Sequence, residues 1–212
     1  MNKYFLDLNK FPEGKIFDKM REYASEKKVP IINDEGLAFL LFIIKITKAK
    51  NILEIGTAIG FSAINMASLG NDIVIDTIER DKNMFLEATK NVVKANYENR
   101  INIYNCDALE FDESLLGNKK YDLIFIDAAK AQYIKFFEKY EKYLSTDGVI
   151  FTDNLLFHGL INNSTNIESK NLRNLVLKIE KFNEWLKNNE NYNSSFFDIG
   201  DGIAISKRCI DE

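Results

Sequence analysis

Acidic residues follow four short apolar segments of the chain, and each acid stands at or just beyond the end of its segment. The acids are Glu79, Asp107, Asp127 and Asp153, after residues 73–78, 101–105, 121–126 and 148–152. Carboxylates can accept hydrogen bonds from sugar hydroxyls or bind a hard cation. The carboxyl ends of parallel strands meet at one edge of a sheet, where ligands of open α/β sheets bind. Taken singly, each acid also fits a solvated strand end, but their shared edge favours one binding site.

A metal site is predicted where the last two of these segments end. Asp127 and the Asp153-Asn154 pair would bring two carboxylates and one amide oxygen together from adjacent strand ends. An all-oxygen set supplied by few protein groups suits Mg²⁺ (or Mn²⁺) and leaves positions for water and substrate. His158 is the only histidine, and we interpret it as a loop residue rather than a ligand.

The residues that follow segments 51–55, 73–78 and 101–105 favour S-adenosylmethionine as the cofactor. Gly56 and Gly60 let the chain turn sharply and let a ligand approach the backbone, but their spacing is not that of the GxGxxG pyrophosphate-binding motif. Glu79 stands about 20 positions further on, where a ribose diol is bound, and Asp107-Ala108 can reach an adenine edge. An adenosine site without a phosphate-binding loop fits this sulfonium cofactor better than a nucleotide.

These residues lie in a regular alternation of strand and helix patterns. Strands are expected at 51–55, 73–78, 101–105, 121–126 and 148–152, followed by a closing hairpin of 195–199 and 203–206 around the Asp201-Gly202 step. Helices are expected at about 13–27, 35–47, 83–96, 131–144 and 172–187. The alternation predicts an α/β fold with a doubly wound, mostly parallel Rossmann-like sheet. We expect one domain over 1–212, with N-terminal helices in 1–48 and the α/β core in 49–212.

Bulk composition excludes several classes of protein. The chain has 212 residues, 46% hydrophobic and 28% charged, and its longest strongly apolar run is far shorter than the roughly 20 residues of a membrane-spanning helix. Only five of its 28 basic residues are Arg and its net charge is −4, which disfavours a large non-specific nucleic-acid surface. Cys106 and Cys209 form no CxxC pair. A cytoplasmic protein with no membrane partner is expected.

Six motifs occur in the order and at the spacing of a known family: EIGTAIGFS, TIER, CDA, FIDAAKAQY, TDNLLFHGL and GDGIAIS. Over about residues 29–207 the chain resembles class I S-adenosylmethionine-dependent O-methyltransferases of the catechol and caffeoyl-CoA type. Within that group it looks most like the bacterial enzymes that methylate 5-hydroxyuridine at the tRNA wobble position. Residues 29–32, 152–157 and 183–186 favour this branch.

The resemblance implies a role for each matching residue. It implies cofactor contacts at Ile32, Ser62, Glu79, Asp107, Ala108 and Asp127, in addition to Gly56, and metal ligation by Asp127, Asp153 and Asn154. It implies catalysis at Lys130 and Asp127, because Lys130 matches the catalytic lysine of the catechol-type enzymes. The metal would chelate two vicinal substrate oxygens, and Lys130 would take or offset the hydroxyl proton. A surface salt-bridge lysine is the alternative for Lys130. A homodimer is expected from the resemblance alone.

Three functions stay open at this point. The leading hypothesis is methylation of tRNA 5-hydroxyuridine to 5-methoxyuridine, since a 5-hydroxyuracil offers a hydroxyl next to a carbonyl. The first alternative is a small-molecule catechol or caffeoyl-CoA-type O-methyltransferase, because a catechol presents the same pair of oxygens. The second is a catalytically silent S-adenosylmethionine-binding module, against which the intact set of Asp127, Lys130, Asp153 and Asn154 argues.

Overall fold

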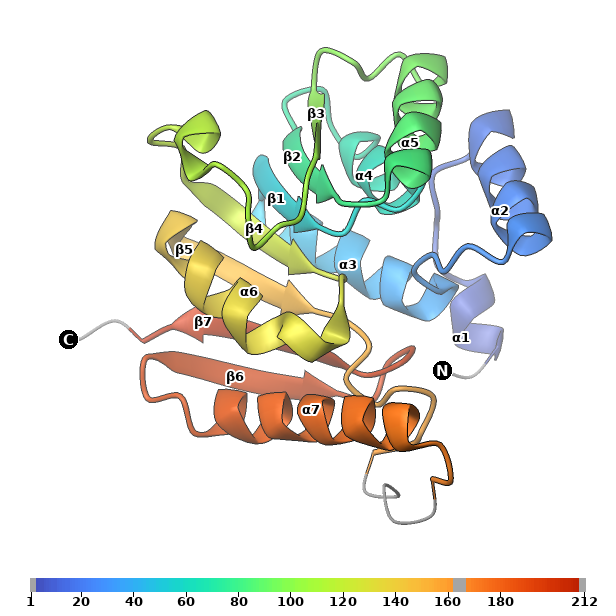
Figure 1. Ribbon diagram of the computed structural model, residues 1–212. Helices are drawn as coiled ribbons and strands as arrows, with labels where there is room; N and C mark the ends of the chain where they lie inside the picture. The colour runs from blue at the N-terminus through green and yellow to red at the C-terminus, as the bar shows by residue number, and fades with distance from the viewer. Residues whose placement is uncertain (1–2, 162–166, 210–212) are drawn as a thin grey trace.

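The fold is built around one seven-stranded sheet (Figure 1). The computed structural model describes residues 3–161 and 167–209. The strands run in the order β3-β2-β1-β4-β5-β7-β6. Their bounds are β1 Asn51–Ile55, β2 Val74–Glu79, β3 Ile101–Asn105, β4 Tyr121–Ile126, β5 Leu144–Thr152, β6 Tyr192–Phe197 and β7 Ile203–Arg208. Strands β1 to β5 pair in parallel, whereas β7 is antiparallel to both β5 and β6. The predicted doubly wound sheet with a closing hairpin is confirmed.

Helices cover both faces of the sheet (Figure 1). They are α1 Lys3–Asp7, α2 Lys15–Lys27, α3 Asp34–Thr47, α4 Phe61–Ala67, α5 Lys82–Lys94, α6 Tyr133–Tyr140 and α7 Lys170–Lys187, with short 3₁₀ turns at Glu113–Leu116, Lys130–Gln132 and Glu141–Tyr143. Side chains of a strand alternate between the faces. In β4, Leu123 and Phe125 join the core under α2 to α5, while Ile124 and Ile126 join the core under α6 and α7. All four are fully buried, as the apolar run predicts.

The local signals place most elements within a few residues of their expected bounds. The side chain of Asn33 accepts a hydrogen bond from the Gly36 amide and so caps the start of α3. One expectation is wrong: residues 131–144 do not form one continuous helix. Only Tyr133–Tyr140 is α-helical, and β5 already begins at Leu144, four residues before the expected strand start.

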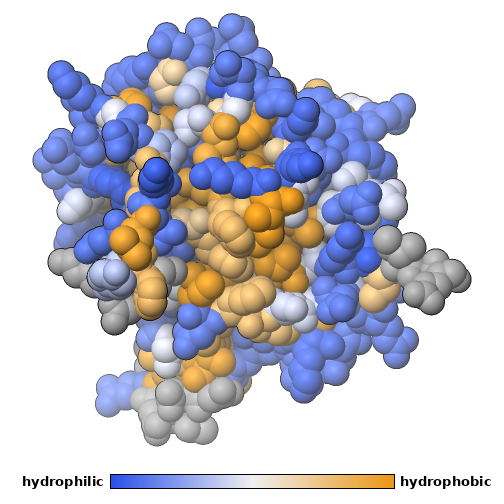
Figure 2. Space-filling model, turned by 180° about the vertical axis from the view of Figure 1, so that it is seen from behind, coloured by the Kyte–Doolittle hydropathy of each residue, from blue (hydrophilic) through white to orange (hydrophobic). Residues whose placement is uncertain are grey.

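The surface behind the sheet carries exposed apolar side chains on α3 and β6 (Figure 2). Phe42 and Ile46 on α3 are each more than half exposed, and Phe197 on β6 is partly exposed. The Phe39 and Phe197 rings lie 5.0 Å apart and join the helix to the hairpin. No helix among the described residues is long and apolar enough to span a membrane.

Candidate active site

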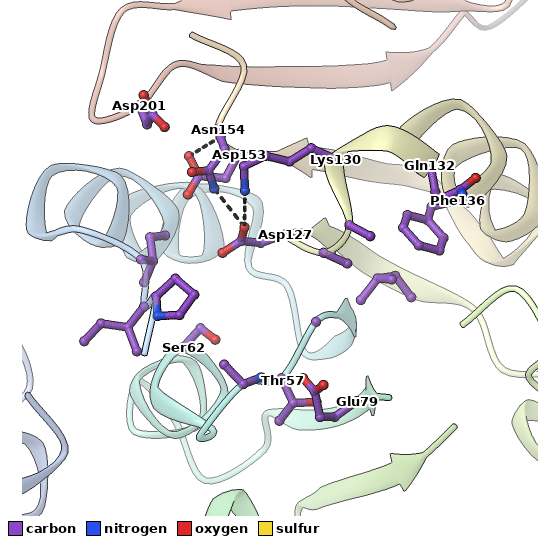
Figure 3. A pocket seen from close by; sticks show the side chains of 18 of the residues that line it. Thr57, Ser62, Glu79, Asp127, Lys130, Gln132, Phe136, Asp153, Asn154 and Asp201 are labelled. Carbon is purple, nitrogen blue, oxygen red and sulfur yellow. Dashed lines mark hydrogen bonds and ion pairs between the residues drawn. The ribbon is translucent and has the colours of Figure 1, made fainter. Parts of the chain in front are cut away.

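One cavity of about 1410 Å³ opens at the carboxyl ends of the central strands (Figure 3). Every residue predicted for the site lines it: Ile32, Gly56, Ser62, Glu79, Asp107, Ala108, Asp127, Lys130, Asp153 and Asn154. The volume exceeds the roughly 300–1,000 Å³ typical of a pocket for one small ligand. The cavity therefore has room for a cofactor and a substrate together.

Two carboxylates are positioned by backbone hydrogen bonds that extend the sheet past its strands. The Asp127 amide donates to the Ile55 carbonyl at 3.0 Å, and the Asp153 amide donates to the Ile126 carbonyl at 3.1 Å. Both side chains consequently project from neighbouring strand ends into the cavity. The side chain of Asn154 follows and donates from Nδ2 to Oδ1 of Asp127 at 2.8 Å (Figure 3).

The electrostatics of this cluster fit a divalent cation. Burial raises the pKa of Asp127 and of Asp153, and the Asp127 charge raises the pKa of Asp153 further. Two partly desolvated carboxylates side by side are unfavourable without a compensating positive charge, which a bound cation supplies. Within residues 3–161 and 167–209, no three His, Cys, Asp or Glu side chains form a metal-binding group. The amide of Asn154 would supply a third donor, since a half-turn of the amide brings its oxygen to face the carboxylates.

Lys130 is the basic side chain nearest to the carboxylate pair. Its Nζ lies 4.0 Å from Oδ1 of Asp127, and its side chain is 20% exposed, so it faces the cavity rather than bulk solvent. Tyr133 lies behind the cluster and donates from its hydroxyl to the Asp153 carbonyl at 3.0 Å. The position of Lys130 is therefore compatible with both predicted roles, an ion pair with Asp127 and a catalytic group in the cavity.

The cofactor side of the cavity is shaped by Glu79 and its neighbours. Oε2 of Glu79 accepts from the Ala58 amide at 2.8 Å and Oε1 accepts from the Asp81 amide at 2.7 Å. These bonds fix the carboxylate at the end of β2 and leave lone pairs for a diol. Asp107 is held in the same way, because Oδ1 accepts from the Leu109 amide at 2.8 Å.

Glu54 is a buried carboxylate that is absent from the predicted site. It is fully buried in β1 and accepts hydrogen bonds from Ser62 Oγ and from Thr77 Oγ1. Burial raises its pKa to about 7, and these two bonds only partly offset the rise. It holds Ser62, a predicted cofactor contact, at the cavity wall. The signal in the sequence was an acid inside the apolar segment 51–55.

Position 56 requires glycine for the packing of the backbone as well as for the approach of a ligand. Its φ is +103°, and a Cβ placed there would lie 2.1 Å from the Asp127 carbonyl oxygen. Only glycine lets the turn after β1 pass so close to the end of β4. The turn after β1 therefore contacts the backbone of Asp127, which is both a predicted cofactor contact and a predicted metal ligand.

The far end of the cavity is lined by the loop after β5 and by the β6–β7 turn. Leu156, Phe157 and His158 come from the loop, and Asp201 comes from the turn. His158 is a loop residue, as predicted, with a largely exposed ring. Among the described residues that line the whole cavity, the carboxylates are Glu79, Asp81, Asp107, Asp127, Asp153, Asp198 and Asp201, and the only Lys or Arg side chains are Arg80 and Lys130.

Comparison with known proteins assigns this chain to a family. The O-methyltransferase family model matches residues 11–209. Tapetum-specific methyltransferase 1 of Arabidopsis thaliana is 32% identical, with 99% of this chain and 94% of that protein covered. The caffeoyl-CoA O-methyltransferase of Populus kitakamiensis is 28% identical, with 98% of this chain and 93% of that protein covered.

Solved structures give the same result. A Staphylococcus aureus protein assigned as a caffeoyl-CoA O-methyltransferase is 41% identical, with a TM-score of 0.90 and 98% of each chain covered. The O-methyltransferase from Bacillus cereus, solved in complex with SAH, shares the fold at a TM-score of 0.79 and 24% identity, with 98% of this chain and 96% of that chain covered.

Proposed function

Because the chain belongs to the O-methyltransferase family, we propose that it moves a methyl group from S-adenosylmethionine to a hydroxyl with an adjacent oxygen on a small aromatic molecule. The observation that carries this proposal is the charge of the cavity, in which acidic side chains far outnumber basic ones. Such a lining offers only Arg80 and Lys130 as Lys or Arg partners for phosphate, which favours an uncharged phenol over a polynucleotide or a phosphate-rich thioester.

The cofactor would occupy the side of the cavity lined by Ile32, Ser62, Glu79 and Ala108. Glu79 is fixed at the end of β2, where it can accept hydrogen bonds from both hydroxyls of a ribose. Ala108 is small and 92% buried, so it can pack against a flat base. The sulfonium end then points toward Asp127, which lies between the two halves of the cavity (Figure 3).

Asp127, Asp153 and Asn154 would hold Mg²⁺ or Mn²⁺, which lowers the pKa of the substrate hydroxyl as a Lewis acid and orients it. Lys130 faces this cluster and would stabilise the negative charge that develops on the substrate oxygen, or receive its proton. Leu156 and Phe157 would pack on the aromatic ring and exclude water. The cavity has room for cofactor and substrate side by side, which transfer of the methyl group from sulfonium to oxygen requires.

Methylation of tRNA 5-hydroxyuridine is the second candidate, and it rests on one structural observation. Residues 29–32 and 156–157, which favour the tRNA branch by resemblance, line the cavity, and Asn183 donates to the Leu155 carbonyl at 3.1 Å. Two of the three segments that favour this branch therefore line the cavity, and the third contacts the loop at its far end. A single flipped wobble base could enter where a catechol does. Homodimer formation stays a prediction of the resemblance.

One experiment separates the two candidates. The purified protein is incubated with S-adenosylmethionine and Mg²⁺, with a panel of catechols in one arm and tRNA containing 5-hydroxyuridine in the other. Mass spectrometry then locates the added methyl group. A methylated catechol and unchanged tRNA support the leading proposal, whereas 5-methoxyuridine in the tRNA arm replaces it with the second candidate. No methylation in either arm contradicts both.

A further inference from the structure

The turn Gly200-Asp201-Gly202 contacts two separate walls of the cavity. On one side, the Gly200 amide donates to Oε2 of Glu35 at 3.1 Å, and a Cβ on Gly200 would lie 2.7 Å from Oδ1 of Asn33. Asn33 and Glu35 begin α3 and directly follow Ile32. The turn is therefore packed against the segment that lines the cofactor side.

On the other side, the turn holds the loop that follows the predicted metal ligands. The Leu155 amide donates to the Gly202 carbonyl at 2.9 Å, and the Leu156 amide donates to the Asp201 carbonyl at 2.7 Å. The contact is close, because a Cβ on Gly202 would lie 2.5 Å from Cγ of Leu156. The start of the loop is thereby paired with the hairpin, one residue beyond Asn154.

The side chain of Asp201 extends the same grip to the end of the loop. Its Oδ1 accepts from the His158 backbone amide, and its Oδ2 lies 3.5 Å from Nδ1 of the His158 ring. The side chain is 12% exposed, and Oδ2 is buried without a hydrogen-bond donor. A buried carboxylate that is only partly hydrogen-bonded lowers the stability of the fold, so its presence points to a role in the site.

The loop that follows β5 needs these hydrogen bonds because its backbone is strained. Asn154, Phe157 and His158 have φ values of +66°, +45° and +57°. Each is a non-glycine residue in the left-handed region, which costs of order 1–2 kcal/mol. Without external hydrogen bonds, the loop would relax and change where Asn154 points.

We propose that Asp201 is a positioning residue of the active site, which holds the loop 155–158 in its strained form and so presents Asn154 to a divalent cation and Phe157 to the substrate. This inference rests on the proposed function for the substrate, but its effect on cation binding does not. Asp201 acts through backbone hydrogen bonds to the loop, and neither its charge nor the His158 ring is required.

The test uses Mn²⁺ alone as the probe, titrated into the full chain without cofactor and followed by electron paramagnetic resonance. Asp201→Ala removes the acceptor for the His158 amide and should weaken Mn²⁺ binding about 10-fold or more, the range for groups that orient metal ligands. Asp201→Asn keeps an acceptor oxygen and should bind Mn²⁺ within about threefold of the wild type. His158→Ala keeps the backbone donor and should bind normally.

Asp112→Ala is the matched control, since Asp112 also accepts backbone hydrogen bonds in a turn but lies outside the cavity. Its loss should leave Mn²⁺ binding unchanged. If Asp201→Ala does not fold, Gly202→Ala takes its place, because the added Cβ displaces the same loop from the other side. Wild-type Mn²⁺ affinity in a folded Asp201→Ala or Gly202→Ala protein overturns the proposal. So does an Asp201→Asn protein as weak as Asp201→Ala, which would assign the effect to charge.

Failure of the proposed function would look different. In that case no catechol is methylated by the wild type, while the Mn²⁺ series still follows the order given above. Where a substrate is methylated, Asp201→Ala should raise KM for it and lower kcat, and the affinity for S-adenosylmethionine should stay within about twofold.

Discussion

Nδ2 of Asn154 lies 2.8 Å from Oδ1 of Asp127, and this bond ties the end of β5 to the end of β4. A cation held by these two side chains would need the amide oxygen of Asn154, and not Nδ2, on the side of Asp127, because only oxygen can ligate it.

Replacing Asp153 should separate metal-dependent activity from stability. Asp153→Asn removes one of two buried neighbouring charges, so methyl transfer with Mg²⁺ should fall about 10²–10³-fold. The metal-free protein should become more stable by about 1 kcal/mol, because the charge repulsion is gone. Activity assays and thermal melts in EDTA check both effects. Methyl transfer that persists in EDTA in the wild type would refute the metal role.

Lys130 should matter for turnover and little for cofactor binding. Lys130→Met removes the amino group 4.0 Å from Asp127 and should lower kcat about 10²–10⁴-fold, the usual range for a positioned acid–base group. Lys135→Met is the control, because Lys135 is exposed on α6 nearby. Steady-state kinetics and calorimetric titration with S-adenosylmethionine measure the two quantities. Equal kcat values for the two variants would return Lys130 to a salt-bridge role.

Glu54 should make stability depend on pH. Its pKa is raised from 4.5 to about 7 in the folded protein, so its stabilising contribution is complete below pH 4.5 and is lost as pH rises through 7. Glu54→Gln cannot ionise, and at pH 8 it should be more stable than the wild type by up to about 3 kcal/mol. At pH 5 the two should be close. Urea denaturation at both pH values, with exposed Glu98→Gln as the control, tests this; a difference that is independent of pH would exclude it.

Gly56 should tolerate no side chain. Gly56→Ala would place Cβ 2.1 Å from the Asp127 carbonyl oxygen, and we expect a loss of stability of about 3 kcal/mol together with loss of methyl transfer. Gly117→Ala is matched in having a positive φ of +58°, but no atom lies within 4 Å of its Cβ. It should lose stability through backbone strain alone and keep its activity. Normal activity in Gly56→Ala would show that the end of β4 can shift.

Much of the fold could be predicted from local patterns. The apolar run 123–126 is buried as expected. Tyr133, Phe136, Phe137 and Tyr140 recur at helical spacing and are buried too, because burial along one helix stripe leaves a periodic pattern. The acids converge because parallel strands end at one edge. The early start of β5 was missed, since Leu144 pairs with Tyr121 of β4 across a register shift and regular pairing resumes only at Val149.

The finer parts of the site could not be predicted, because they depend on contacts between distant segments. Gly56 lies against the carbonyl of Asp127, which is 71 positions further along the chain (127 − 56). Asp201 accepts a hydrogen bond from His158, which is 43 positions earlier (201 − 158). Neither leaves a periodic trace. The burial of Glu54 could not be predicted either, because Ser62 and Thr77 come to donate to its carboxylate only in the folded protein.

The grip of the β6–β7 turn on the loop after Asn154 has a consequence for how the protein matures during synthesis. Strand β7 is inserted between β5 and β6, so neither the strand order nor the loop contacts can form before it is made. At roughly 5–20 residues per second, Asn154 leaves the ribosome seconds before Asp201 does. The ends of β1, β2 and β3, with Gly56, Glu79 and Asp107, can therefore form on a nascent chain that still lacks the turn holding the loop after Asn154.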